Sequence, residues 1–336
     1  MSAAGDRQQA GSCSVLSASL AESAYGSAAT AQAWVCLQQD GPWGAKAPTQ
    51  SHLDPELGRW LDKAVDAAGG RLALLRTPGA HPDDHHAGRR QVLVAWCVPG
   101  EEWLLAGSVR SPDELRDLDL AALAEGDRDA VARSLPALAL SDQPHLLVCT
   151  NGRRDVCCAV QGRPVAQGAD AQRPARVWET SHTGGHRYAP TAVLLPSGQT
   201  LARVDAGQAV EALDAAARGE LAAGLLGPVH DRGRSGLPAQ QQAAESAVRA
   251  ATGEVALAAL TSAPAEPAGV PADGSAGVVA GGPADADTWG VTVAHRDGRS
   301  WRALVRRVVE DAERPESCAK GPVPLAHWTV ELDPPD

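Results

Sequence analysis

Short apolar runs alternate with amphipathic helical patterns through the first part of the chain. Residues 55–68 place their apolar side chains at helical spacing, and residues 111–126 open with Ser111, Pro112 and acidic residues, which is typical of a helix start. Four predominantly apolar runs have the length of strands: 33–38, 72–76, 92–98 and 103–107. This alternation predicts a layered α/β unit over residues 13–140.

A second α/β unit is predicted over residues 141–235. Its first strand, 145–150, contains Cys149, and Asp155 is placed to cap a short helix that Pro164 would break or kink if the helix ran on. The later pattern predicts a strand at 175–181, a hairpin formed by 191–196 and 200–204, a helix at 208–221 and a loop at 228–237.

The last region, residues 236–336, is predicted to form a smaller α+β unit. Residues 238–253 have the pattern of a helix closed by a glycine, and the Pro/Gly/Ala-rich stretch 261–287 is typical of a flexible linker. Three strand-like segments follow, at 288–295, 300–309 and 327–332.

Charge and composition narrow the class of protein. The 336-residue chain has a net charge of −11, which argues against a nucleic acid or an anionic membrane as its general partner. The N-terminus lacks the apolar segment of a secretory signal, and no run reaches the roughly 18 apolar residues of a membrane span. Neither a dinucleotide fingerprint nor a P-loop is present. We therefore expect a cytoplasmic protein without a bound nucleotide.

The chain has seven cysteines, an odd number that suits a disulfide framework poorly. Cys36 and Cys97 lie in apolar strand-like runs and are expected to be inert core residues. The positions of Cys13 and Cys318 do not indicate a role. The other three crowd together: Cys149, Cys157 and Cys158.

Two cysteines and two histidines carry the most informative pattern: Cys149, Cys158, His182 and His186. Thiolate and imidazole together select zinc or an iron–sulfur cluster over magnesium or calcium. The cysteines are too far apart in sequence for the tight knuckle of small zinc modules, and a wide loop suits a bulkier cluster. The two glycines between the histidines would let the backbone approach an inorganic centre, and they disfavour a helical metal motif.

These residues resemble a known family. The segments CTNGRRDVCCAVQGRP (149–164) and WETSHTGGHRYAPTAVLLPSG (178–198) are similar to the sucrase/ferredoxin-like family, whose core is a thioredoxin-like ferredoxin domain. Asn151 departs from the pattern, because many relatives carry histidine there. No paired carboxylates argue for the glycoside hydrolysis that part of the family name suggests. Similarity to bacterial members extends over most of the chain, including 13–29, 41–47, 231–249 and Ser317-Cys318.

The resemblance implies a [2Fe–2S] cluster held by Cys149, Cys158, His182 and His186, with Cys157 as the alternate cysteine. Cys158 is preferred because the Cys-x8-Cys spacing then places Arg154-Asp155 where relatives carry Arg-Asp. The implied protein is an electron carrier or accessory redox protein rather than a self-sufficient enzyme. Its partner would be a reductase or an acceptor enzyme.

Histidine ligation would change the chemistry of such a cluster. Two imidazoles leave less negative charge on it than two further thiolates, which raises the reduction potential. We hypothesise that both histidines bind one iron and that a second ring nitrogen carries a proton. The potential would then fall as the pH rises.

Two other functions fit the same residues. The four ligands could hold a structural zinc ion, because four filled positions leave none for water. Cys157 and Cys158 could instead support thiol redox chemistry, although they are adjacent rather than in a Cys-x-x-Cys motif.

The neighbours of the site have ordinary interpretations. Asp155 is expected to cap a helix, and Trp178 and Tyr188 are expected to pack, while Ser181 and Thr183 could donate hydrogen bonds to sulfur. The flanking arginines are expected to be solvated or to form a docking patch: Arg153, Arg154 and Arg187. A polar loop is expected to be solvated, although it could bind a stray metal through His81, Asp83, Asp84, His85 and His86.

Overall fold

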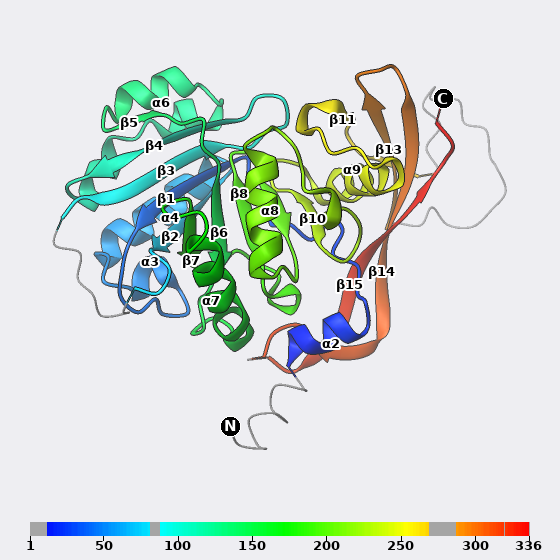
Figure 1. Cartoon of the computed structure of the whole chain (residues 1–336), viewed down its shortest axis with the longest axis horizontal. Coiled ribbons are helices and arrows are strands. Elements are labelled where there is room, and N and C mark those ends of the chain that lie inside the picture. The colour runs from blue at the N-terminus through cyan, green and yellow to red at the C-terminus, as the bar shows by residue number, and fades with distance from the viewer. Residues whose placement is uncertain (1–11, 81–87, 269–286, 319, 336) are drawn as a thin grey trace.

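The computed structural model describes residues 12–80, 88–268, 287–318 and 320–335, so the histidine-rich loop at 81–86 lies outside the described residues. A ten-stranded mixed sheet and a five-stranded sheet organise this part of the chain. Figure 1 shows the larger sheet at the left and centre, with α7 and α8 in front of it, and the smaller sheet at the right. This is the α/β class that the sequence predicts.

The strands predicted in the first part of the chain are all present, as is the helix at 55–68. This part contains α2 (Cys13–Ser19), β1 (Ala33–Gln38), α3 (Ala47–Gln50), α4 (Pro55–Ala67), β2 (Gly70–Arg76), β3 (Arg90–Trp96), β4 (Trp103–Val109), α6 (Arg128–Ser134) and β5 (Leu138–Leu140). The single helix predicted at 111–126 is wrong. It is divided into η1 (Pro112–Asp117) and α5 (Leu120–Ala124), because the Asp119 side chain accepts from the Ala122 amide and caps a new helix.

The middle of the chain also follows the prediction, with two differences. Its elements are β6 (His145–Cys149), α7 (Val156–Asp170), β7 (Val177–Thr180), η2 (His186–Tyr188), β8 (Ala192–Leu195), β9 (Gln199–Leu201), α8 (Ala206–Ala216), η3 (Ala223–Leu225) and β10 (Asp231–Arg234). The helix of Cys157 and Cys158 is long, not short, and runs through Pro164. Val165, Ala166 and Ala169 beyond the proline are buried in the core, and this burial outweighs the lost backbone hydrogen bond.

The predicted loop at 228–237 contains a strand, β10, which pairs antiparallel with β9. Its sequence, Asp-Arg-Gly-Arg, has no alternation of apolar and polar residues, and its charged side chains are buried against polar partners. Gln199 Nε2 donates to Asp231 Oδ1 at 2.6 Å, and Arg234 pairs with Glu245 at 2.9 Å. Such a strand escapes any interpretation that rests on hydrophobic pattern.

One sheet runs through both of the predicted α/β units. Its strand order is β10-β9-β8-β6-β7-β2-β1-β3-β4-β5. The units meet where β7 pairs antiparallel with β2, through Leu75 with Thr180 and Arg76 with Glu179. The domain boundaries at residues 140 and 235 stay predictions. The neighbouring strands β6 and β7 are parallel, so their carboxyl ends, Cys149 and Thr180, lie side by side.

The C-terminal region packs α9 (Ala239–Thr252) against the smaller sheet. After η4 (Leu257–Ala259), its strands are β11 (Leu260–Ser262), β12 (Glu266–Pro267), β13 (Thr288–His295), β14 (Ser300–Pro315) and β15 (Pro322–Leu332). Two strands, β11 and β12, thus occupy the start of the predicted linker. The hairpin of β14 and β15 is longer than predicted and reaches from the small sheet to α2 (Figure 1). No helix in the described ranges has the length and apolar character to cross a membrane.

Candidate metal centre

The four predicted ligands come from three segments that meet at the carboxyl ends of β6 and β7, two inner strands of the large sheet. Cys149 is the last residue of β6, and the loop with the two histidines follows β7, its parallel neighbour. The first turn of α7 then carries Cys158 back over the end of β6. Gly162 permits this close approach, because a Cβ there would collide with the Cys149 carbonyl oxygen.

The four side chains lie near one another, although among the described residues the groups whose ligand atoms all lie within 4.8 Å include neither Cys149 nor His182. Cys158 and His182 are close enough to the Cys149 thiol to lower its pKa. The Cys158 sulfur lies 3.5 Å from Nδ1 of His186, and the rings of His182 and His186 stack with their centroids 4.2 Å apart. Both cysteines are buried and both histidines are half-buried. The set therefore consists of two adjacent thiols beside two adjacent imidazoles.

Cys157 faces a different set of residues. Its sulfur lies 3.7 Å from that of Cys13 and 3.0 Å from that of Cys318. The geometry thus brings Cys158, rather than the alternate Cys157, to Cys149 and the histidines. Cys36 and Cys97 are fully buried in the sheet core, away from either set.

Backbone conformation shapes the histidine loop. Gly184 and Gly185 have φ values of +92° and +70°, a region that side chains disfavour. A Cβ on Gly185 would also collide with the guanidinium of Arg232. The Gly184 amide donates to Nδ1 of His182 at 3.3 Å, so the tight turn also holds this ring in place.

The electrostatics suit metal binding. A hydrogen bond from Cys158 holds the pKa of Cys149 well below its usual range, and the same bond raises the pKa of Cys158. Within the pair, a thiolate is therefore favoured at Cys149 over Cys158. Burial and the neighbouring His182 lower the pKa of His186 to about 4, so this imidazole is neutral and able to act as a ligand.

One buried and one half-buried arginine near the site, Arg232 and Arg71, are not indicated by the sequence. Arg232 is 1% exposed and donates to the carbonyl oxygens of Gly184, at 3.1 Å, and of Ser27. Burial lowers its pKa to about 10, so it is still charged at neutral pH. Arg71 donates to the His182 carbonyl oxygen at 3.5 Å. The run Asp-Arg-Gly-Arg around Arg232 contains no apolar residue, so the sequence predicts a loop there and does not indicate a buried cation.

The neighbours predicted to have ordinary roles can now be placed. Asp155 caps α7 by accepting from the Cys157 amide at 2.9 Å. The Thr183 backbone, not its hydroxyl, bonds to Cys149, while the Ser181 hydroxyl accepts from the Leu74 amide at 3.0 Å. Asn151 is buried and braces the loop, donating to the Gly44 carbonyl oxygen at 3.2 Å.

The aromatic residues and arginines around the site divide into buried and exposed groups. Trp178 donates to Nδ1 of His145 at 3.1 Å, at the far end of β6. Tyr188 is buried beneath three guanidinium groups. Arg187 is not a solvated residue, because it pairs with Glu22 at 2.6 Å with its side chain 13% exposed. Arg153 and Arg154 are exposed, as predicted.

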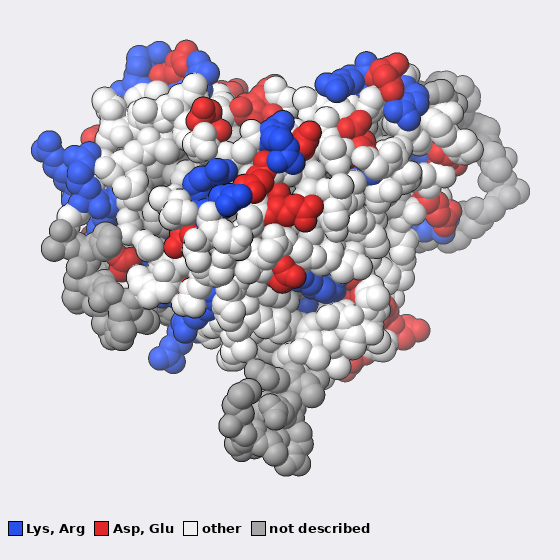
Figure 2. Space-filling view, in the orientation of Figure 1, with Lys and Arg blue, Asp and Glu red and all other residues white. Residues whose placement is uncertain are grey.

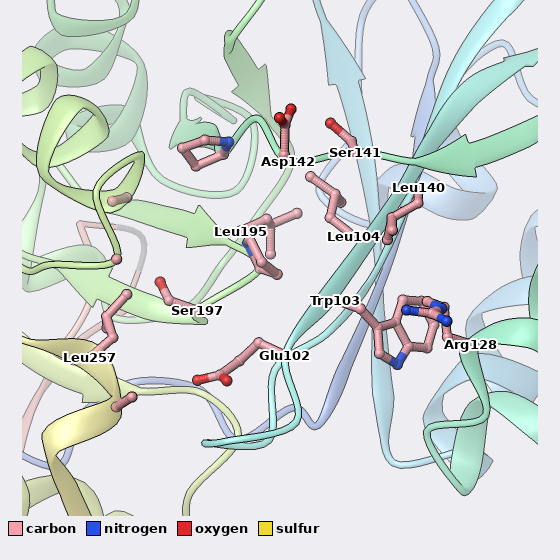
Figure 3. Close-up of a pocket in the computed structure, with 15 residues that line it drawn as sticks. Glu102, Trp103, Leu104, Arg128, Leu140, Ser141, Asp142, Leu195, Ser197 and Leu257 are labelled. Carbon is pink, nitrogen blue, oxygen red and sulfur yellow. The ribbon is translucent and has the colours of Figure 1, made fainter.

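Two cavities differ in their relation to the site. One, of about 370 Å³, adjoins the loop after Cys149 and is lined by Trp43, Arg76, Asn151, Arg153 and Arg163, among others. The larger one, of about 780 Å³, lies at the opposite end of the strands, and Figure 3 shows Glu102, Leu195 and Ser197 around it. Of these two cavities, the smaller one lies nearer the cysteines.

Surface charge on the face seen in Figure 2 is mixed, with acidic and basic side chains interspersed over its centre. Among the described residues, two groups place their ligand atoms within 4.8 Å of one another: Asp155, Cys158 and His186, and Cys13, Asp155, Cys157 and Cys318. The region around the start of α7 is thus able to bind metal.

No curated protein and no solved structure matches the chain. The sucrase/ferredoxin-like family matches residues 24–222, which include β1 to β9, α7 and all four predicted ligands. The chain therefore belongs to the sucrase/ferredoxin-like family.

Proposed function

We propose that this protein transfers single electrons through a [2Fe–2S] cluster held by Cys149, Cys158, His182 and His186. The observation that carries the proposal is the convergence of these four donors from β6, α7 and the loop after β7. The two thiols lie together and the two imidazoles lie together. This pairing suits a cluster in which the cysteines bind one iron and the histidines bind the other.

The cluster, when bound, would accept and return one electron. Two ferric ions, two sulfides and two thiolates cancel in charge, so the oxidised centre would be neutral and the reduced centre negative. The buried Arg232 and the half-buried Arg71 supply positive charge that would offset the added electron. Both histidines are half-buried, which supports their position on the outer, solvent-facing side.

The chain can also couple electron transfer to a proton. In His182 the Gly184 amide occupies Nδ1, so His186 is the better carrier of a proton on the ring nitrogen that does not bind metal. Reduction would raise the basicity of that nitrogen. We therefore expect the reduction potential to fall as the pH rises, and a potential independent of pH from about 6 to 10 would contradict the coupling.

The partner is proposed to be a reductase or an acceptor enzyme with an acidic surface. The exposed Arg153 and Arg163 line the small cavity beside the cysteine loop, where an acidic surface would approach the centre. All seven cysteines are free, which supports a reducing compartment such as the cytoplasm. We propose a carrier rather than an enzyme with its own substrate.

The test is the visible spectrum of the purified full-length protein, together with iron and acid-labile sulfide assays. We expect a coloured protein with two iron and two sulfide per chain, the content of one [2Fe–2S] cluster. A colourless protein with one zinc at these ligands would overturn the proposal in favour of structural zinc. The thiol redox alternative has less support, because the sulfurs of Cys157 and Cys158 contact different partners.

Neighbouring residues supply a matched control. Cys158→Ala should abolish the iron and the visible spectrum, while Cys157→Ala should keep both, because only Cys158 contacts His186. The opposite result would transfer the ligand role to Cys157.

A further inference from the structure

A second group of thiols lies beside the four-ligand centre. The sulfurs of Cys13, Cys157 and Cys318 are separated by 3.7, 3.4 and 3.0 Å. Asp155 joins them, with Oδ2 at 4.0 Å from the Cys13 sulfur. Three of the four residues are buried, and Cys318 reaches solvent. These residues come from α2, from the start of α7 and from the turn between β14 and β15.

The spacing of the sulfurs suits one tetrahedral ion. Zinc binds thiolate sulfur at about 2.3 Å, which places the sulfurs of a tetrahedral site about 3.8 Å apart. All three separations here are below that value, so a small outward movement of the sulfurs would make room for one ion. A disulfide would use two of the sulfurs and leave the third without a partner.

Asp155 is held in position to complete the set. Its Oδ2 accepts from the Ser317 hydroxyl and from the Cys318 amide, each at 2.9 Å, while Oδ1 accepts from the Cys157 amide. Such bonds orient a carboxylate toward a metal in known sites. Thiolate and carboxylate ligands together suit zinc, and binding would displace protons from the thiols without any redox step.

We propose that Cys13, Cys157 and Cys318, with Asp155 as the fourth donor, bind one zinc ion distinct from the four-ligand centre. The zinc joins segments that lie 144 and 161 residues apart in sequence. It fixes α2 and the tip of the long hairpin against the start of α7, next to Cys158. This inference does not depend on what the other centre binds.

The experiment measures metal content by mass spectrometry in full-length protein purified under reducing conditions. We expect one zinc per chain in the wild type in addition to whatever metal the four-ligand centre holds. Cys13→Ser and Cys318→Ser should each lose that zinc and keep the metal of the other centre. Cys97→Ser, at a buried cysteine outside both groups, should keep both metals. Cys158→Ala should have the converse effect and remove only the other metal.

Three results would overturn the proposal. The first is an unchanged zinc content in both serine variants, and the second is loss of both metals together. The third is wild-type protein that lacks zinc and has two of the three thiols blocked as a disulfide. Cys318 is exposed, so Cys318→Ser should fold, and an unchanged circular dichroism spectrum would verify this. Hydrogen exchange adds a second measure, because zinc removal should speed exchange in α2 and in the hairpin tip.

Discussion

At the scale of one residue, the buried charge of Arg232 both fixes the backbone of the histidine loop and alters the electrostatics of the proposed site. Its guanidinium packs over Tyr188 at 5.4 Å and donates to the Gly184 carbonyl oxygen, so it fixes the turn between the histidines. It also places a positive charge close to the two ligand cysteines, both of which favour its charged form. Arg232 is a positioning residue, because it acts through the conformation of the histidine loop and through its positive charge.

Replacing this cation should lower the reduction potential of the proposed cluster. In Arg232→Gln the added electron loses a neighbouring positive charge, so we expect the potential to fall by on the order of 60 mV, a tenfold change in equilibrium constant for one electron. A redox titration followed by electron paramagnetic resonance measures this. Arg232→Lys should recover much of the shift. Arg173→Gln, at a half-exposed pair with Asp214, should leave the potential unchanged, and an equal effect there would contradict the argument.

The four candidate ligands could be named from the sequence, but their surroundings could not be predicted from it. Cysteine and histidine are rare enough, and their spacing specific enough, to single out four positions. The choice between Cys157 and Cys158 depends on which way each side chain leaves the first turn of α7. Arg232 and Arg71 look like ordinary surface residues in the sequence, because burial of a charge depends on distant parts of the fold.

At the scale of the element, the position of α7 determines whether the two proposed ligand cysteines, Cys149 and Cys158, lie together. Its core-facing side packs Val165 and Ala166 against the sheet, while Gly162 lies against the end of β6. Glycine inside a helix ordinarily weakens it relative to alanine. Here the missing side chain is what brings the helix close to Cys149.

Gly162→Ala should therefore weaken the site although it improves helix propensity. A glycine-to-alanine change in a helix interior stabilises by roughly 1 kcal/mol where space permits. At Gly162 the new methyl group collides with the Cys149 carbonyl oxygen, so we expect α7 to shift and metal occupancy to fall severalfold. Val160→Ala, on the exposed side of the same helix, is the control. Full occupancy and a higher melting temperature in Gly162→Ala would contradict this role.

Elements with a strong pattern were predictable, and those that depend on tertiary contacts were not. The strand β1 and the helix α4 follow directly from apolar periodicity. The strand β10 has buried charges in place of apolar residues, and the helix α7 continues through Pro164 because its far half is packed. In both cases the compensation comes from residues distant in sequence.

At the scale of the molecule, the chain encloses its site with segments from both ends. The helix α2 and the tip of the β14–β15 hairpin meet at the start of α7, where the sulfurs of Cys13, Cys318 and Cys157 lie close together. The Arg187 guanidinium donates to the Ala326 carbonyl oxygen at 2.9 Å and strengthens this closure. Contacts between residues some 300 positions apart, such as Cys13 and Cys318, could not be read from sequence spacing.

The continuous sheet predicts that its two halves unfold together. At the joint, Arg76 on β2 pairs with Glu179 on β7 at 2.6 Å, with side chains 5% and 3% exposed. The Thr150 hydroxyl donates to the same carboxylate at 2.8 Å. Removing one partner of a buried pair strands the other charge, so Glu179→Gln should cost about 3–5 kcal/mol of unfolding free energy. Breaking the half-exposed pair of Arg173 and Asp214 should cost far less, because solvent screens that pair.

Hydrogen exchange measured by mass spectrometry can follow β1 and β3 on one side of the joint and β6 and β8 on the other. If the sheet opens as one unit, the opening free energies of the two sides agree in the wild type and fall by the same amount in Glu179→Gln. Loss of protection confined to one side would show that the halves are separate folding units, as the boundary at residue 140 in the sequence-based prediction implies. Agreement would instead mean that β7, whose end leads into the histidine loop, takes its stability from strands more than a hundred residues earlier in the chain, through its pairing with β2.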